Sequence, residues 1–120
     1  MEHGAATHIS GRWENQLTSR VRFVTSDGSI TGTFTSGVGA AGTEHALTGF
    51  YDPSPRHGSC TLGFVVSWPD EHSVTVWSGH YEAERDVIVA TWLLSSDTAR
   101  GDWRSTTIGH DEFRRLREEE

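Results

Sequence analysis

The sequence predicts an all-β protein, an eight-stranded antiparallel up-and-down β-barrel. Short runs rich in Val, Ile, Thr, Phe and Trp alternate along the chain with clusters of Gly, Ser, Asp and Pro, which is the pattern of strands joined by turns. The runs are evenly spaced and their connections are short, as in an antiparallel meander. A closed barrel is favoured over a sandwich because closure leaves no strand edge unpaired. The expected strands are residues 11–18, 20–26, 29–36, 45–51, 59–68, 73–81, 87–95 and 103–113.

Each connection between these runs has a composition that ends a strand. Asp27 and Gly28 favour a tight hairpin, since both tolerate the positive φ that such turns require. Residues 69–72 and 82–85 are polar turns, and residues 52–58 form a loop with two prolines. The segment 37–42 holds three glycines, too many for a stable strand, and is expected to be a mobile loop.

The chain of 120 residues has the length of one domain. We expect a flexible segment at residues 1–10, the barrel at residues 11–113 and a charged tail at residues 114–120. No apolar run in the sequence approaches the length of a membrane span.

Composition argues against several classes of function. Ten basic and seventeen acidic residues give a net charge of −7, which does not suit a protein that binds nucleic acid through its phosphates. The single cysteine, Cys60, excludes an internal disulfide and a cysteine zinc site. The seven histidines have no metal-ligand spacing, so neither a metal nor another cofactor is expected. A hydrolase is an alternative, but the chain has no Gly-x-Ser-x-Gly motif for an activated serine.

Two of the expected strands carry tryptophan and hydrogen-bonding residues on the same face. Alternate residues of a strand share a face, so these faces can be read from the sequence. The residues that share a face are Trp13, Asn15, Leu17 and Ser19 on the first strand, and Ser73, Thr75 and Trp77 on the sixth. Because a buried polar group without a partner is costly, such an interior favours a ligand-binding barrel. The alternative is an ordinary barrel with partly exposed tryptophans.

The seventh strand predicts an oligomer. Residues 87–94 are nearly all apolar, so both faces of this strand must be covered. The outer face of an antiparallel barrel is normally wet. We therefore expect a second subunit to cover Val87, Val89, Thr91 and Leu93.

Five motifs, in order and at compatible spacing, resemble the avidin family, and its bacterial, streptavidin-like members most closely. They are GRWENQL at 11–17, VWSGHY at 76–81, TWLL at 91–94, WRST at 103–106 and GHDEF at 109–113. The resemblance implies an eight-stranded barrel that is secreted, is not an enzyme and binds biotin with high affinity at one open end. It also implies a homotetramer.

The family's contacts with the ureido group of biotin fall on four residues of this chain. Asn15 and Ser19 match the residues that donate to the ureido carbonyl oxygen, and Ser36 and Asp111 match those that accept from the two ureido N–H groups. An amide and a hydroxyl can donate, and an ionised carboxylate accepts. The alternative is a lipocalin-like carrier of another small apolar molecule. Such a ligand would form no hydrogen bonds with these four residues.

Further residues match the walls, the mouth and the lid of the family's site. Thr75 matches the hydroxyl that faces the thiophene sulfur, while Ser73 and the backbone N–H of Ala40 match the groups that meet the carboxylate. The segment 37–42, which contains Gly39, matches the lid. The residues that match the walls are Val38, Trp68, Trp77, Trp92 and Leu94.

Trp103 matches a tryptophan that reaches into the pocket of a neighbouring subunit, whereas Phe34 and Ala40 depart from the family's pattern. The family usually has a tyrosine at the position of Phe34, and its hydroxyl is a third donor to the ureido oxygen. Phenylalanine keeps the shape and loses that hydrogen bond. Streptavidin-like members have an asparagine at the position of Ala40, so here the backbone alone would serve the carboxylate. Both departures lower the expected affinity.

Overall fold

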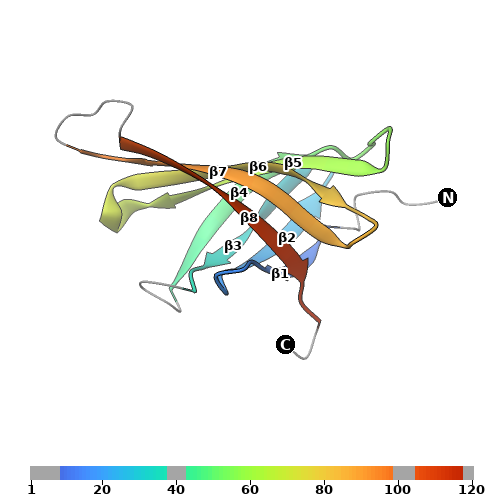
Figure 1. The fold of residues 1–120 in the computed structure, drawn as a ribbon, viewed down its shortest axis with the longest axis horizontal. Helices are drawn as coiled ribbons and strands as arrows, with labels where there is room; N and C mark the ends of the chain where they lie inside the picture. Colours follow the sequence, from blue (N-terminus) through green and yellow to red (C-terminus); the bar gives the residue numbers. More distant parts are fainter. Residues whose placement is uncertain (1–8, 38–42, 99–104, 118–120) are drawn as a thin grey trace.

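The computed structural model of the chain describes residues 9–37, 43–98 and 105–117. Eight antiparallel strands form a closed barrel in which each strand pairs with its neighbours in sequence order and β8 returns to β1 (Figure 1). The predicted fold class is confirmed. The strands are β1 Gly11–Glu14, β2 Arg20–Ser26, β3 Ser29–Thr35, β4 Glu44–Tyr51, β5 Ser59–Trp68, β6 Ser73–Glu82, β7 Val87–Ser96 and β8 Thr106–Arg115, with a short 3₁₀ turn, η2, at Pro69–Glu71.

The β2–β3 connection is the tight hairpin that the sequence predicts. Asp27 and Gly28 have φ values of 48° and 91°, and Ser26 pairs with Ser29 across the turn. Positive φ at both central residues is the geometry of a type I′ turn, whose twist matches that of the flanking strands.

The first strand ends at Glu14, so the prediction of a strand through residue 18 is wrong. The side-chain oxygen of Asn15 accepts hydrogen bonds from the backbone N–H groups of Leu17 and Ser19, both at 2.9 Å. These bonds form a turn in which Thr18 has a φ of 62°. An asparagine that bonds the backbone just after it favours a turn over a strand.

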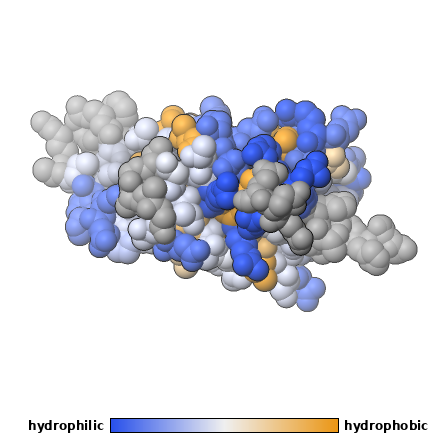
Figure 2. All heavy atoms as spheres, turned by 90° about the horizontal axis from the view of Figure 1, so that it is seen from below, coloured by the Kyte–Doolittle hydropathy of each residue, from blue (hydrophilic) through white to orange (hydrophobic). Residues whose placement is uncertain are grey.

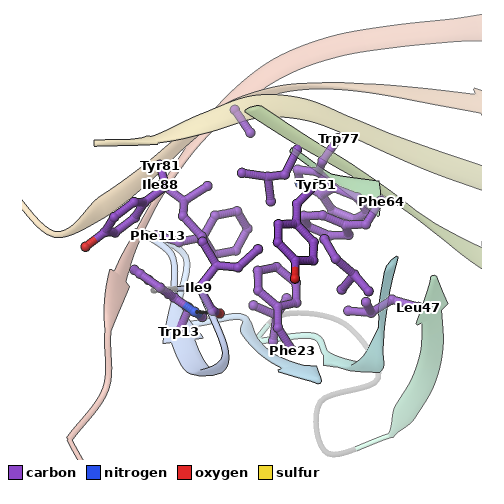
Figure 3. Close-up of a cluster of buried hydrophobic side chains, with 14 of the residues drawn as sticks. Ile9, Trp13, Phe23, Leu47, Tyr51, Phe64, Trp77, Tyr81, Ile88 and Phe113 are labelled. Atoms are coloured by element: carbon purple, nitrogen blue, oxygen red, sulfur yellow. Dashed lines mark hydrogen bonds between the residues drawn. The ribbon is translucent and has the colours of Figure 1, made fainter. Parts of the chain in front are cut away.

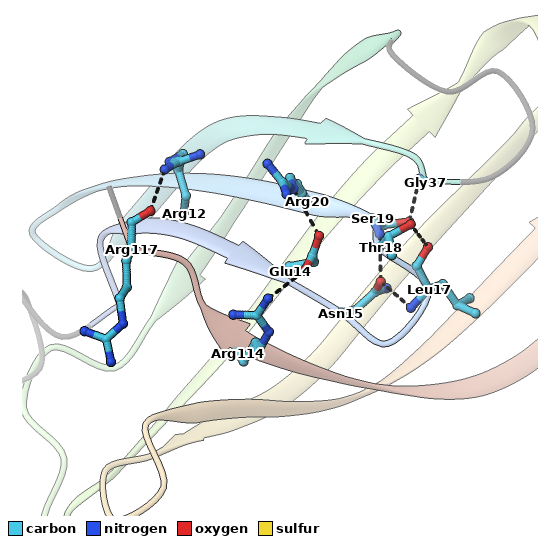
Figure 4. Close-up of polar contacts among 10 residues, drawn as sticks. All are labelled: Arg12, Glu14, Asn15, Leu17, Thr18, Ser19, Arg20, Gly37, Arg114 and Arg117. Carbon is cyan, nitrogen blue, oxygen red and sulfur yellow. Dashed lines mark hydrogen bonds and ion pairs between the residues drawn. The ribbon is translucent and has the colours of Figure 1, made fainter. Parts of the chain in front are cut away.

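The seam between β1 and β8 closes the barrel. Two residue pairs join these strands, Trp13 with Arg115 and Glu14 with Arg114. The Glu14 carboxylate binds Arg20 of β2 at 3.1 Å and Arg114 of β8 at 3.0 Å, so it links three strands (Figure 4). β8 therefore continues beyond the expected boundary at residue 113.

The hydrophobic core fills the end of the barrel that carries the β2–β3, β4–β5 and β6–β7 connections. Trp13 is fully buried there, and its indole N–H donates to the carbonyl of Ile9 at 2.9 Å (Figure 3). Ile9 is itself fully buried, although it falls in the expected flexible segment. The Arg115 guanidinium lies 4.3 Å from the centre of a Trp13 ring and pairs with Asp86 at 3.0 Å. This end of the barrel is closed.

The outer face of β6, β7 and β8 carries a row of exposed apolar side chains. Val76, Leu93 and Ile108 are neighbours in the strand register and are 45%, 46% and 64% exposed. Val87, which was expected in this outer patch, is instead buried within the single chain at 7% exposure. It lies between Glu82 and Arg114 in the register, two long side chains of the kind whose stems cover apolar neighbours.

Figure 2 shows a face of the molecule on which hydrophobic residues form small separate areas among hydrophilic ones.

Within the described ranges, the chain contains no helix with the length and apolar character needed to span a membrane.

Candidate functional site

A cavity of about 300 Å³ lies at the end of the barrel opposite the core. Its lining comes from the β1–β2 turn, the end of β3 and the residue after it, the start of β4, the end of β5, η2, and residues of β6, β7 and β8, which the up-and-down topology brings together. The described residues that line it are Asn15, Leu17, Ser19, Phe34, Ser36, His45, Trp68, Glu71, Thr75, Trp77, Trp92, Leu94 and Asp111.

The turn after β1 orients two hydrogen-bond donors at this cavity. The Asn15 amide oxygen already accepts from two backbone N–H groups, which fixes the amide and leaves its NH₂ group to donate. The Ser19 hydroxyl oxygen accepts from the backbone N–H of Gly37 at 3.0 Å, so its own proton is available for donation. Figure 4 shows these bonds within the turn and from Ser19 to Gly37. Both residues are buried, and these hydrogen bonds orient their side chains before any ligand arrives.

Asp111 on β8 places a carboxylate at the same cavity. One oxygen accepts from the Trp77 indole N–H at 2.8 Å and the other from the Gln16 amide at 2.9 Å. A carboxylate has about four acceptor positions, so each oxygen retains capacity for a further donor. Asp111 is 7% exposed, and an additional N–H donor from a ligand would bond to it away from water.

Gln16 is a functional residue that sequence analysis missed. Besides its bond to Asp111, its amide oxygen accepts from the backbone N–H of Glu112 at 3.0 Å and its NH₂ group donates to the carbonyl of His110 at 3.1 Å. These three bonds hold the β1–β2 turn against β8 and fix the Asp111 carboxylate. No sequence pattern indicated this role, because the expected strand placed Gln16 on the outer face.

Aromatic side chains form the walls of the cavity. The Phe34 ring lies 5.5 Å from that of Trp68 and 5.1 Å from that of Trp77. Trp68 donates its indole N–H to the Thr75 hydroxyl at 2.9 Å, which fixes the indole and leaves the Thr75 proton free to turn toward a ligand. Trp92 packs over Gly109, where a β-carbon would collide with the indole ring. The glycine of the GHDEF motif therefore makes room for a wall.

The structure brings ten of the predicted site residues to one cavity. They are Asn15, Ser19, Phe34, Ser36, Trp68, Thr75, Trp77, Trp92, Leu94 and Asp111. Ser73 is buried at 9% exposure but does not line the cavity. The predicted contacts at Val38, Gly39, Ala40 and Trp103 lie outside the described residues.

Three lining residues were absent from the predicted site: Leu17, His45 and Glu71. His45 pairs with Phe34 across β3 and β4, so the alternation of β4 could have placed it on the inner face. Glu71 belongs to the polar turn η2, for which the sequence gives no such signal. The arrangement as a whole suits a flat ligand that offers one acceptor to Asn15 and Ser19 and one donor to Asp111.

The chain matches known proteins over nearly its whole length. A sequence model of the Avidin family matches residues 3–116. Avidin from Gallus gallus is 33% identical over 119 residues, which cover 91% of this chain and 78% of the relative. Avidin-related protein 4/5 from Gallus gallus is 32% identical, and the match covers 90% of this chain and 77% of the relative. Avidin-related protein 3 from Gallus gallus is 30% identical, and the match covers 91% of this chain and 78% of the relative. The predicted likeness to streptavidin-like members is not tested by these relatives and stays a prediction.

Proposed function

This chain belongs to the avidin family, and we propose that it binds biotin non-covalently and with high affinity in the cavity at the open end of its barrel. The observation that carries the proposal is the joint placement of two oriented donors and one carboxylate in a cavity with aromatic walls. Proteins of this family are binding proteins rather than enzymes. Bound biotin is therefore released without chemical change.

The ureido group of biotin fits the polar end of the cavity. The Asn15 NH₂ group and the Ser19 hydroxyl donate to the ureido oxygen, and Asp111 and Ser36 accept from the two ureido N–H groups. Donors and acceptors at opposite ends of a urea polarise it in the same direction. Such polarisation strengthens each hydrogen bond in a low-dielectric cavity. Because the protein groups are already fixed by Gly37, Gln16 and Trp77, little conformational entropy is lost on binding.

The walls take the bicyclic ring and its chain. Trp68, Trp77 and Trp92 contact the fused rings, and Thr75 turns its hydroxyl proton toward the sulfur. Leu94 and Val38 contact the valeryl chain, while Ser73 and the Ala40 backbone N–H meet the carboxylate beneath a lid that includes Gly39. Phe34 fills its position without a hydroxyl, so the ureido oxygen has two side-chain donors.

The outer row Val76, Leu93 and Ile108 supports the proposal that the protein assembles. A contiguous exposed apolar patch on a barrel favours association with a second copy. We place this row at a two-fold interface and Trp103 at a second interface, where it closes a neighbour's pocket, which gives a secreted homotetramer with four sites.

A carrier of an apolar ligand is the less favourable alternative. Such a ligand would bury the Asn15 NH₂ group and the Ser19 hydroxyl proton without giving them partners, and it would leave the remaining acceptor positions of Asp111 unused. Each unpaired neutral donor costs about 1–3 kcal/mol.

Calorimetric titration of the purified protein with biotin tests the proposal. We expect saturation at one biotin per chain, with a change in tryptophan fluorescence because Trp68, Trp77 and Trp92 line the cavity. A medium-chain fatty acid of similar volume serves as the control and should not compete. Absence of biotin binding, or equal binding of the fatty acid, would contradict the proposal.

A further inference from the structure

His45 faces the cavity but has no part in the proposed contacts with biotin. It is the second residue of β4 and lies opposite Phe34 in the strand register. Its imidazole ring lies edge-on to Trp68, with 4.7 Å between the ring centres. His45, Phe34 and Trp68 therefore form one wall of the cavity, here called the histidine wall.

Burial fixes which nitrogen of the His45 ring carries the proton. Nδ1, the nitrogen nearer the backbone, is enclosed and has no hydrogen-bond partner within the described part of the chain. A proton on Nδ1 would be an enclosed, unpaired donor, which is costly. A neutral imidazole can place its single proton on either nitrogen. The geometry therefore favours the Nε2–H form, with the donor at the tip of the ring.

The histidine wall has no other side-chain donor to offer a ligand. Phe34 has no polar atom, and the indole N–H of Trp68 is already bonded to Thr75. The described lining carries two carboxylates, Asp111 and Glu71, and contains no lysine or arginine. A negatively charged ligand tail in this cavity thus meets like charge without a cationic partner in the described lining, and the Nε2–H of His45 offers it a hydrogen-bond donor.

We infer that His45 is a further biotin-binding residue, whose Nε2–H donates a hydrogen bond to the carboxylate at the end of the valeryl chain. The inference rests on the proposed function, and it assigns to His45 selectivity for an acidic tail. Asp111 is committed to the ureido group, so the carboxylate of the valeryl chain needs a donor elsewhere in the lining, and the Nε2–H of His45 can supply it.

The test compares His45→Phe with the wild type against two ligands. One is biotin, and the other is an analogue whose valeryl chain ends in a methyl group instead of a carboxylate. Phenylalanine keeps a ring against Trp68 and removes the donor. We expect biotin to dissociate from the variant about tenfold faster, as for the loss of one hydrogen bond to a charged group. The dissociation rate of the analogue should change less than twofold. His45→Gln, which retains an N–H donor, should recover most of the biotin affinity.

His57→Phe is the matched control, because His57 is exposed in the β4–β5 loop at the closed end. This substitution should change the dissociation rate of neither ligand. Equal losses for biotin and the analogue in His45→Phe, or no loss for either, would overturn the inference while leaving the proposed function intact. A wild-type protein that binds neither ligand would contradict both.

A measurement on the wild type does not depend on how the variants fold. Nitrogen NMR of ¹⁵N-histidine-labelled protein should show His45 with Nε2 protonated and Nδ1 bare. Biotin, but not the methyl-terminated analogue, should shift the Nε2–H proton downfield. A proton on Nδ1, or identical spectra with the two ligands, would overturn the inference.

Discussion

Replacing Asp111 with alanine should weaken biotin binding by about 10- to 150-fold. The carboxylate is 7% exposed and lines the cavity, so water cannot readily take its place. Hydrogen bonds to a charged group contribute about 1.5–3 kcal/mol each, and each 1.4 kcal/mol is about a tenfold change in affinity. The loss of one such bond to a ureido N–H gives the stated range.

The same substitution also removes two bonds within the protein. The Trp77 indole N–H, now 2.8 Å from Asp111, would be left without its acceptor, and the Gln16 amide would lose one of its anchors. An unpaired buried N–H costs about 1–3 kcal/mol of stability. Asp111→Ala should therefore lower the melting temperature as well as the affinity.

Calorimetry and dissociation rates, measured well below the melting temperature of the variant, separate the two effects. Glu112→Ala is the matched control, because Glu112 is the next residue of β8 and its side chain is 53% exposed on the outer face, where it pairs with Arg85. It should leave the biotin affinity within about twofold. An Asp111→Ala protein that is folded, with near-ultraviolet circular dichroism intact, and that binds biotin within threefold of the wild type would refute the assignment of the site.

Further predictions concern the pocket, the assembly and the single thiol. Phe34→Tyr should slow biotin dissociation by about 2- to 10-fold, the worth of one neutral hydrogen bond of about 0.5–1.5 kcal/mol; an unchanged or faster rate would show that the hydroxyl does not reach the ureido oxygen. Trp103→Lys should speed dissociation by roughly tenfold or more and shift the assembly toward dimers in light scattering; a tetramer with undiminished biotin retention would place Trp103 in its own subunit. Cys60 is 1% exposed, and burial raises the pKa of its thiol, so little reactive thiolate exists at neutral pH. It should react with a thiol reagent more slowly in the native than in the unfolded protein, and comparable rates would contradict the burial.

The order and type of the strands could be predicted from the sequence because the signals are local. The hairpin at Asp27 and Gly28 needs only two residues that tolerate positive φ. The alternation of Ser73, Thr75 and Trp77 places all three on the inner face, and all three are buried. Closure of the sheet then follows because an up-and-down barrel leaves no edge strand.

The tertiary structure decided how deep each inward residue lies. Alternation assigns a side chain to a face of the sheet but not to a level along the barrel. Trp13 and Asn15 share a face in the sequence, yet Trp13 lies in the closed core and Asn15 lies at the cavity. The level depends on strand tilt and stagger, which the whole closed sheet sets.

The tertiary structure also decided which residues orient the site. Alternation through residue 18 would place Gln16 on the outer face, but the backbone leaves the strand at Glu14 and brings the Gln16 amide 2.9 Å from Asp111, a residue 95 positions further along the chain. His45 likewise became a binding candidate only when the structure set its ring against Trp68 of β5, in the lining of the cavity. The sequence by itself determined the strands, their turns and the chemical types of the inward residues, since these depend on neighbours along the chain. The partners that hold Asp111 come from parts of the chain that are distant in the sequence and meet only in the closed barrel. The partners of His45 come from its neighbouring strands β3 and β5, and only the tertiary structure decides how these side chains pack.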